Sequence, residues 1–437
     1  MRISVIGLGK LGAPLAAVLS SKGFEVVGAD LNQGFVDAIN QGKAPVVEPR
    51  LQEKIDIGAS RLSATTSVEE AALKTEASFI IVPTPTGPDG TFVIDYVLAA
   101  AEQIAKAIAK KSSYHLVSLT STVMPGDTEK HVKPLLEKVS GKKCGQDFGL
   151  CYNPEFIALG NVINDMLNPD FILIGQSDPH AGDIVESIYN VSCDKPPTFA
   201  RMNFINAELS KISLNSYVTL RISFANQLAR LCDHLPGADV DVVTGALGLD
   251  SRIGKKYLKG AVSFGGPCFP RDNIAFSKLA LNNGTEAPIA TTTDYINDSY
   301  LAYLAEKMQK HLPAGGTIGL LGLSYKPETS VVEASPSLKL ARLLIARSVP
   351  VVAYDPQAMP EAQRQISEGI VYVPAMAECA AQADLLAVLV AWPEFKSLTP
   401  KQLKNQGKDV VLFDYWRILP RQDFERAGCR YFASGQG

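Results

Sequence analysis

The sequence predicts an α/β protein in which two doubly wound domains are joined by a long central helix or helical domain. Three observations lead to this prediction. Short β-rich runs alternate with helical stretches in the first half of the chain, which is typical of a parallel sheet with crossover helices. From Asn203 to Asp233 the chain has helical periodicity without proline or glycine. The αβ alternation then restarts from Gly315.

Composition limits the class of protein. A chain of 437 residues is too long to fold around a single hydrophobic core. We expect three domains, at residues 1–200, 201–300 and 301–437. It is 46% hydrophobic and 20% charged, as in compact soluble proteins. The net charge of -3 gives no general attraction to nucleic acid or anionic lipid. No apolar run is long enough for a membrane span, and Met1 leads into a strand pattern rather than a signal peptide.

The cysteines indicate a reducing compartment. Their number is odd, they are scattered, and no two form a CxxC pair; they are Cys144, Cys151, Cys193, Cys232, Cys268, Cys379 and Cys429. This spacing argues against a disulfide framework and against a zinc site. We therefore expect no metal, and we expect the protein in the cytoplasm.

The elements follow from these patterns in chain order. In the first half we expect helices at Ala13–Ser21 and Val97–Ala109 between strands at Arg2–Ile6, Glu25–Ala29, Phe79–Val82, His115–Ser118 and Gly149–Tyr152. The helix at Asn203–Asp233 would span about 45 Å, so we expect it to connect two domains and to offer a face to a second subunit. Beyond it we expect a helix at Ser335–Arg347 and strands at Thr317–Leu321, Val349–Tyr354, Ala383–Val390 and Asp409–Phe413.

The first expected strand runs into a glycine motif, Gly7-Leu8-Gly9-Lys10-Leu11-Gly12. Such glycines allow a tight turn, the approach of a pyrophosphate and close packing of the next helix. The second strand ends at Asp30, where a carboxylate can bind the ribose hydroxyls. No arginine follows to accept a 2′-phosphate, so the motif predicts a Rossmann-like domain that binds NAD rather than NADP. A purely structural glycine turn is the alternative.

Two further segments follow expected strands. Pro83 and Thr84 close one strand, and Thr122 lies in the segment Ser121–Gly126 after the next. Ligands of a doubly wound sheet bind at the carboxyl ends of its strands, so we expect these residues to border the cofactor. A pair of ordinary proline turns is the alternative.

Three more positions carry reactive groups. Glu155, in Asn153-Pro154-Glu155-Phe156, can activate water, or it is simply an exposed loop residue. Lys211 and Asn215 share one face of the long helix at i, i+4, where a lysine either serves a site or extends into solvent. Cys268 follows two glycines and a proline, with Asp272 four residues on. A thiol placed there can attack a bound carbonyl, whereas buried packing is the alternative.

The chain also resembles a known family. The run from Asp250 to Lys259, continuing through Phe264-Gly265-Gly266 to Cys268 and Asp272, resembles the substrate loop of the UDP-glucose 6-dehydrogenase family, within the wider nucleotide-sugar dehydrogenases. Glu208, Lys211 and Asn215 resemble the helix motif of that family. Three further segments of this chain resemble other motifs of the family: Ser121–Val123, Asn153–Phe156 and Gly322–Pro327. The resemblance covers essentially the whole chain and weakens after about Ser330.

This resemblance implies a two-step oxidation of the C6 alcohol of a nucleotide sugar to a carboxylate, with two NAD. Cys268 would trap the aldehyde as a thiohemiacetal, and a second hydride transfer would give a thioester. Lys211 would stabilise the oxyanion, and Asp272 and Asn215 would position lysine and water. Glu155 and Thr122 would handle water and proton transfer.

The resemblance also implies the binding contacts. The cofactor would be bound by Gly7, Gly9, Leu11, Gly12, Asp30, Pro83, Thr84, Thr122, Glu155 and Arg271. The UDP-sugar would be bound by Phe156, Lys211, Asn215, Arg252, Tyr257, Lys259, Phe264, Gly265, Cys268, Phe269, Lys326 and Arg417. Among these, Arg252 would reach the sugar site of a neighbouring subunit, which implies a homodimer or higher homo-oligomer. The C-terminal α/β unit would hold the nucleotide diphosphate.

Some positions depart from the family pattern. Leu159 stands where a second glutamate is usual, and Pro267 where a serine is usual; Thr329–Glu333 contains no arginine, and Arg417 is displaced by one place. UDP-glucose is the expected substrate. GDP-mannose or another UDP-hexose is the close alternative. A two-electron hydroxyacid dehydrogenase and a non-catalytic nucleotide-sugar-binding protein are the more distant ones.

Overall fold

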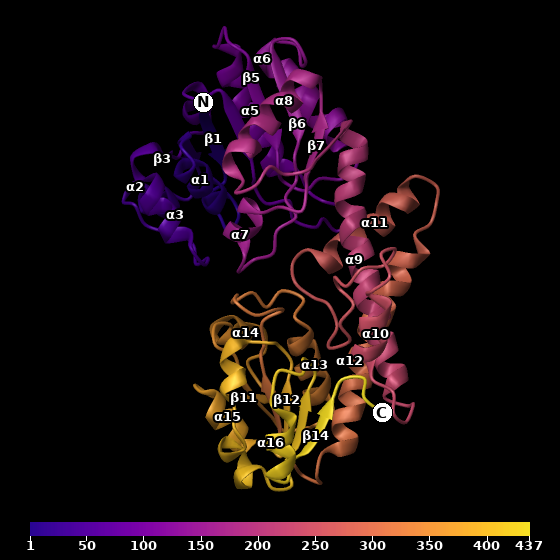
Figure 1. Ribbon diagram of the computed structural model, residues 1–437. Coiled ribbons are helices and arrows are strands. Elements are labelled where there is room, and N and C mark those ends of the chain that lie inside the picture. The colour runs from indigo at the N-terminus through magenta and orange to yellow at the C-terminus, as the bar shows by residue number, and fades with distance from the viewer. The chain divides into compact units, whose positions relative to one another are not determined.

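The computed structural model describes residues 1–437 and divides into two compact units, Met1–Ser213 and Leu214–Gly437. The division falls inside α9 (Phe204–Cys232), which runs through it as one helix (Figure 1). Each unit holds one sheet flanked by helices, so the predicted α/β class with two doubly wound parts and a long central helix is confirmed. The finer division at residues 200 and 300 stays a prediction. No helix has both the length and the apolar character needed to cross a membrane.

The first unit is built on an eight-stranded sheet of order β3-β2-β1-β4-β5-β6-β7-β8. The strands from β3 to β6 are parallel, whereas β7 is antiparallel to β6 and parallel to β8. The strands are β1 (Arg2–Ile6), β2 (Glu25–Ala29), β3 (Leu62–Thr65), β4 (Ala77–Ile80), β5 (His115–Leu119), β6 (Phe148–Tyr152), β7 (Ile172–Gln176) and β8 (Phe199–Met202). The order of strands reverses between β1 and β4, and ligands of such sheets bind at the carboxyl ends there.

Helices cover both faces of this sheet. Successive residues of a strand point to opposite faces, and accordingly Ile3 and Val5 pack in one core while Ile6 packs in the other. One core contains residues of α1, α3, α7 and α8, and the other contains residues of α4, α5 and α6. The helices are α1 (Gly12–Ser21), α2 (Gln33–Asn40), α3 (Leu51–Gly58), α4 (Val68–Leu73), α5 (Asp95–Ala109), α6 (Lys133–Ser140), α7 (Val162–Leu167) and α8 (Pro179–Ser192).

Several elements of this unit differ from the sequence prediction. The strand predicted at Phe79–Val82 lies at Ala77–Ile80, because Ile81 and Val82 already belong to the loop that follows. The sequence analysis predicted no strand at β3, β7 or β8. The residues of β7 are almost all buried, whereas those of the edge strands β3 and β8 are mostly half-buried. An edge strand that buries few side chains leaves only a weak apolar pattern.

The second unit is built on a six-stranded parallel sheet of order β11-β10-β9-β12-β13-β14. Its strands are β9 (Ile318–Leu321), β10 (Val351–Tyr354), β11 (Ile370–Tyr372), β12 (Leu385–Val388), β13 (Val411–Asp414) and β14 (Arg430–Ala433). The helices after α9 are α10 (Val240–Leu247), α11 (Phe269–Asn282), α12 (Pro288–His311), α13 (Pro336–Ala346), α14 (Met359–Gln365), α15 (Met376–Gln382) and α16 (Arg421–Arg426). The predicted strands at Val349–Tyr354 and Ala383–Val390 are each shortened, since flanking apolar residues lie in buried loops.

Both sheets have the same arrangement where their first strand ends. We call it a joint: a glycine turn that is hydrogen-bonded to the end of the neighbouring strand and to the aspartate that follows that strand. Gly7 and Gly322 have φ of 98° and 97°, and their N–H groups donate to the last residue of the neighbouring strand, to Ala29 O at 2.7 Å and Tyr354 O at 2.9 Å. An aspartate then follows each neighbouring strand and accepts from the turn. Asp30 Oδ2 accepts from Leu8 N at 2.6 Å, and Asp355 Oδ2 accepts from Leu323 N at 2.7 Å.

The joint of the second sheet is the more buried. Asp355 is 1% exposed, and its carboxylate accepts hydrogen bonds from Leu323 N, Ser324 N, Ser324 Oγ, Gln357 N, Ala358 N and Trp392 Nε1. Asp30 is half-buried and accepts from two backbone N–H groups, those of Leu8 and Asn32. A buried carboxylate with this many donors holds three strand-end loops in one arrangement.

We expect Asp355→Asn to lower the free energy of unfolding of the second unit by about 2–3 kcal/mol, because an amide nitrogen would face donors that need an acceptor. The two tryptophans, Trp392 and Trp416, both lie in this unit, so urea unfolding followed by tryptophan fluorescence measures the effect. Asp30→Asn is the matched control; because the first unit contains no tryptophan, its unfolding is followed by circular dichroism, and its transition should shift less. Equal shifts would contradict the stated role of Asp355.

Candidate active site

The three glycines of the turn in the first unit have different surroundings: two pack against backbone, and one faces open space. A Cβ on Gly12 would lie 1.8 Å from Gly7 O, and one on Gly7 would lie 2.6 Å from Ile81 O. In contrast, a Cβ on Gly9 would meet no atom within 4 Å. Gly7 and Gly12 therefore let the backbone pack closely, while Gly9 leaves open space at the amino end of α1, where an anion is stabilised. Leu11 precedes α1 directly, and the side chain of Lys10 is exposed.

Asp30 lies beside this turn at the carboxyl end of β2. Its carboxylate accepts from Leu8 N at 2.6 Å and from Asn32 N at 2.8 Å. A carboxylate has about four acceptor sites, so two are left for ligand hydroxyls. The donor set and the open space at Gly9 fit a dinucleotide, whereas binding of the ribose by Asp30 stays a prediction.

The loops after β4 and β5 are joined to each other. Ser121 Oγ donates to Val82 O at 2.7 Å, Thr84 is buried, and Pro83 is exposed. Thr122 is half-buried in the second of these loops. The structure thus brings the predicted residues Pro83, Thr84 and Thr122 to one edge of the sheet.

Glu208 of α9 holds the loop after β5. It is 0% exposed, and its two carboxylate oxygens accept from Gly126 N at 2.6 Å and from Thr128 N at 2.9 Å. Burial raises the pKa of Glu208, while these backbone hydrogen bonds lower it. The sequence resemblance included Glu208 without assigning it this task. Apart from that resemblance, no sequence feature indicated this contact, since α9 contains several other polar residues.

Glu155 and Lys211 lie together in the first unit. Lys211 Nζ donates to the backbone oxygen of Glu155 at 2.6 Å and lies 4.5 Å from the centre of the Phe156 ring. Lys211 is only 8% exposed, so the alternative in which it extends into solvent is wrong. Glu155 is half-buried rather than exposed.

The ionisation of Glu155 is perturbed. Burial raises the pKa of its carboxyl to about 7, although a hydrogen bond from Tyr189 and the charge of Lys211 both lower it. A carboxyl group with a pKa near neutrality can both accept and give up a proton at working pH. This arrangement suits Glu155 to proton transfer.

The reactive-thiol candidate lies in the second unit. Among the seven cysteines, Cys268 is the one whose side chain is exposed, so the alternative of buried packing is wrong. Cys268 occupies the N-cap position of α11, where the helix stabilises negative charge. One turn into α11, Asp272 is 0% exposed and accepts from Asn215 Nδ2 at 2.7 Å and from Arg271 Nε at 3.1 Å. The predicted residues Cys268, Asp272, Asn215 and Arg271 are therefore neighbours.

The loop before Cys268 packs against the loop that follows β9. A Cβ on Gly265 would lie 2.2 Å from Ala334 O, and one on Gly266 would lie 2.5 Å from the ring of Tyr325. Only glycine permits this approach. The motif at Gly322–Pro327, which contains Lys326, is thus placed beside the cysteine loop.

Phe264 is fixed at the start of this loop. Asn297 of α12 accepts from Phe264 N at 2.8 Å and donates to Phe264 O at 3.0 Å. The rings of Phe264 and Phe269 meet edge to face with centres 6.4 Å apart. Two of the four aromatic residues predicted for the substrate, Phe264 and Phe269, therefore lie in this loop and at the start of α11.

The charged residues predicted for the substrate already have partners. Lys259 and Arg417 both contact Asp241, at 2.5 and 3.4 Å, and Arg417 also pairs with Asp239 at 2.7 Å. The side chain of Arg252 is 87% exposed and pairs with Asp250 at 2.6 Å. Tyr257 is half-exposed at φ 63°. Their roles with a substrate stay predictions.

One departure from the family pattern has a clear structural reason. Leu159 packs against the apolar core of the first unit, together with Leu11 and Ile157. A glutamate at this half-buried place would lose the apolar contacts that Leu159 makes with the core. The position therefore holds no second acid beside Glu155.

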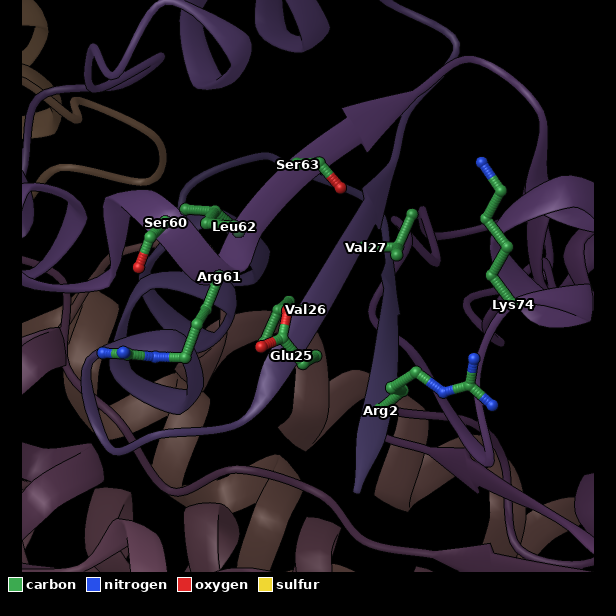
Figure 2. Close-up of a pocket in the computed structure, with 9 residues that line it drawn as sticks. All are labelled: Arg2, Glu25, Val26, Val27, Ser60, Arg61, Leu62, Ser63 and Lys74. Carbon is green, nitrogen blue, oxygen red and sulfur yellow. The ribbon is translucent and has the colours of Figure 1, made fainter.

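A surface hollow of about 280 Å³ lies at the opposite edge of the first sheet (Figure 2). It is formed where β1, β2 and β3 begin, and its cations already have partners. Arg2 pairs with Glu76 at 3.0 Å, Lys74 pairs with Glu70 at 2.7 Å, and Arg61 donates to Ser20 O at 3.0 Å. This hollow is therefore no candidate for the cofactor, which needs the carboxyl ends of the strands.

Comparisons with known proteins agree with this geometry. Three domain models of the UDP-glucose/GDP-mannose dehydrogenase family match in order, the NAD binding domain at residues 1–192, the central domain at 205–299 and the UDP binding domain at 319–421. The chain is 32% identical over 427 residues to the UDP-glucose 6-dehydrogenase AglM of Haloferax volcanii, covering 97% of this chain and 98% of that protein.

Two further relatives extend the comparison. A GDP-mannose 6-dehydrogenase of Azotobacter vinelandii is 36% identical over 359 residues, which is 81% of each chain. The solved structure of a UDP-glucose dehydrogenase from Pyrobaculum islandicum superposes with a TM-score of 0.89 at 33% identity, covering 100% of this chain and 98% of that one.

The glycine turn yields a paired prediction. We expect Gly9→Ala to keep the fold and to weaken NAD binding about tenfold or more, because the new methyl group fills the open space. Gly12→Ala should instead destabilise the first unit by about 1–3 kcal/mol, since its methyl group would meet backbone. Calorimetric NAD titration and thermal unfolding of both variants separate the two effects. Unchanged NAD binding by Gly9→Ala would contradict the assignment.

Proposed function

The chain belongs to the UDP-glucose/GDP-mannose dehydrogenase family, and on this basis we propose that it oxidises UDP-glucose to UDP-glucuronate. It is an NAD-dependent oxidoreductase, and its first 192 residues match the NAD binding domain of the family. The observation that most supports a four-electron oxidation is the single exposed thiol, Cys268, at the amino end of α11. A two-electron dehydrogenase has no use for such a thiol.

NAD supplies the hydride acceptor, and two molecules are used in turn. We propose that Gly7, Gly9, Leu11 and Gly12 hold its pyrophosphate and that Asp30 holds a ribose. Pro83, Thr84, Thr122, Glu155 and Arg271 contribute further contacts with it. These assignments rest on the open space at Gly9 and on the position of the loops at the carboxyl ends of the strands.

The first oxidation removes one hydride and one proton from the C6 alcohol, which gives an aldehyde. Glu155 and Thr122 handle the proton, which the near-neutral pKa of Glu155 supports. The thiolate of Cys268 then adds to the aldehyde carbon and forms a C–S bond. Lys211 stabilises the oxyanion that results, since an ammonium group held in a water-poor place is effective against developing negative charge.

The second oxidation removes a hydride from the thiohemiacetal carbon and a proton from its oxygen, which leaves a thioester. Water then adds to the thioester carbon, the C–S bond breaks, and the thiol of Cys268 is restored as the carboxylate leaves. Asp272 and Asn215 position lysine and water. Their mutual hydrogen bond of 2.7 Å supports a fixed arrangement of the two side chains.

UDP-glucose is preferred over GDP-mannose for two reasons. The C-terminal part of the chain matches a domain described as UDP binding. The relatives named UDP-glucose 6-dehydrogenase match over nearly the full chain, whereas the GDP-mannose relative matches over 81% of it. We propose that Phe156, Tyr257, Lys259, Phe264, Gly265, Phe269, Lys326 and Arg417 contact this substrate, and GDP-mannose or another UDP-hexose is the alternative.

We further propose a cytoplasmic homodimer. No disulfide joins any of the cysteines, which suits a reducing compartment. On α9, Tyr217, Phe224 and Leu231 recur every seven residues and are 58%, 46% and 54% exposed. A heptad stripe of large apolar side chains is typical of helix pairing, so this face is offered to a second copy of the chain.

The substrate and the thiol are tested together. With UDP-glucose and NAD we expect two NADH per sugar and UDP-glucuronate as the product. Cys268→Ser should abolish this turnover and leave NAD binding and thermal stability unchanged, because the side chain is exposed and serves chemistry rather than packing. Cys144→Ser is the matched control and should retain activity.

The outcomes distinguish the alternatives. Turnover only with GDP-mannose or another nucleotide hexose would replace the proposed substrate. One NADH per sugar, or normal uronate formation by Cys268→Ser, would refute the thioester route. If no nucleotide sugar gives NADH although the protein binds NAD, the result would favour a non-catalytic binding protein.

The dimer is tested by mixing two inactive variants. If Arg252 serves the site of the neighbouring subunit, Arg252→Ala and Cys268→Ala should each be inactive, and subunit exchange between them should restore activity. Arg252 is suited to such a contact because its side chain is 87% exposed. Absence of recovery, with exchange verified by native mass spectrometry, would place Arg252 in its own subunit's site or outside any site.

A further inference from the structure

Tyr189 of α8 connects two side chains at the end of β6. Its hydroxyl lies 2.8 Å from Asn153 Oδ1 and 3.0 Å from Glu155 Oε1. Tyr189 is 5% exposed and Asn153 is 1% exposed. Asn153 is itself fixed, because its Nδ2 donates to Leu173 O at 3.0 Å. The amide oxygen of Asn153 therefore faces Tyr189 in one defined orientation.

The single hydroxyl proton of Tyr189 determines which neighbour it can donate to in each protonation state of Glu155. A tyrosine hydroxyl has one proton to donate and can also accept, but both of its neighbours here are acceptors when Glu155 is ionised. In that state Tyr189 satisfies the carboxylate. When Glu155 is protonated, it can donate to the oxygen of Tyr189, and Tyr189 can turn its proton to Asn153. Both protonation states of Glu155 thus keep their hydrogen bonds without any movement of heavy atoms.

The surrounding charges favour this behaviour. Groups that face Glu155 from the other elements are Lys211 of α9, which lowers its pKa, and Asp165 of α7, which raises it. Burial raises the pKa of Tyr189 well above its usual value, and the charge of Glu155 and the nearby Cys193 act in the same direction. Tyr189 therefore remains a neutral hydroxyl while Glu155 titrates.

We propose that Tyr189 is a positioning residue that sets the ionisation of Glu155 and, with Asn153, satisfies it in both protonation states. This inference rests on the proposed function, in which Glu155 carries a proton in each oxidation. Neither the glycine, cysteine and helix motifs nor the family resemblance pointed to Tyr189. Its position in the chain, on the helix before β8, gives no sign of a contact with residues 153–155.

The inference predicts shifts of opposite sign in two variants. Tyr189→Phe removes a hydrogen bond to the carboxylate, so the apparent pKa of Glu155 should rise, by about one unit on the scale of one hydrogen bond to a charged group. Asn153→Ala removes the acceptor that Tyr189 needs when Glu155 is protonated, so the apparent pKa should fall. In the pH profile of kcat/KM the acidic limb should move up in the first variant and down in the second.

Tyr114→Phe is the matched control. Tyr114 also packs against α8, where its ring meets His180 with centres 4.7 Å apart, but its hydroxyl contacts neither Glu155 nor Asn153. This variant should leave the acidic limb in place. A purely structural role of Tyr189 would lower activity at all pH values without moving the limb, and that result would overturn the inference. If Asn153→Ala fails to fold, the Tyr189→Phe profile still decides.

A second measurement does not need turnover. The carbonyl stretch of protonated Glu155 can be followed by infrared difference spectroscopy during a pH titration of the NAD-bound protein, and Glu155→Gln assigns the band. The midpoint should rise in Tyr189→Phe. If the midpoint shifts but the protein oxidises no nucleotide sugar, the proposed function is refuted and the inference about Tyr189 stands. Normal turnover with an unmoved midpoint would do the reverse.

Discussion

A carboxylate at the end of the second strand of each sheet fixes the ligand-bearing edge of that sheet. Asp30 and Asp355 both accept a backbone N–H from the turn after the first strand, at 2.6 and 2.7 Å. The turn in each case begins with a glycine whose φ is near +98°, so the chain can reverse sharply there. Of the candidate site residues, Gly7, Gly9, Gly12 and Asp30 belong to the first joint, and Lys326 lies in the loop that begins at the second.

The two joints are alike in backbone and different in what they leave open. In the first sheet the turn ends in Gly9 and Gly12, and Gly9 faces open space. In the second sheet the corresponding positions are Ser324, whose hydroxyl donates to Asp355 at 3.0 Å, and Pro327. Trp392 Nε1 also donates to Asp355 Oδ2 and to Ser324 Oγ, both at 3.2 Å. One turn type thus serves an NAD binding domain in one half and a differently lined edge in the other, which agrees with the two domain descriptions.

Helix α9 supplies groups to both units because it is not interrupted. Glu208 and Lys211 belong to the first unit, where Glu208 holds the loop after β5 and Lys211 donates to Glu155 O. One turn later Asn215 donates to Asp272 in the second unit. The buried polar side chains of this helix explain why its apolar pattern is less regular than its length suggests.

The sequence by itself determined the α/β class, β1 and β2 to the residue, the extent of α9 to within one residue at each end, and the glycine turn, and it singled out Cys268 as the candidate nucleophile. These features follow from local chemistry: strand runs, glycines that need positive φ, and a helix without proline or glycine. Tertiary structure alone decided β7 and the edge strands β3, β8, β11 and β14, the contact of Gly265 and Gly266 with the loop after β9, and the pairing of Tyr189 with Glu155. Edge strands bury too little to leave a pattern, and a hydrogen bond between residues 34 positions apart leaves no local trace. The pKa of Glu155 belongs to the same group, because burial and neighbouring charges set it, and both exist only once the chain has folded.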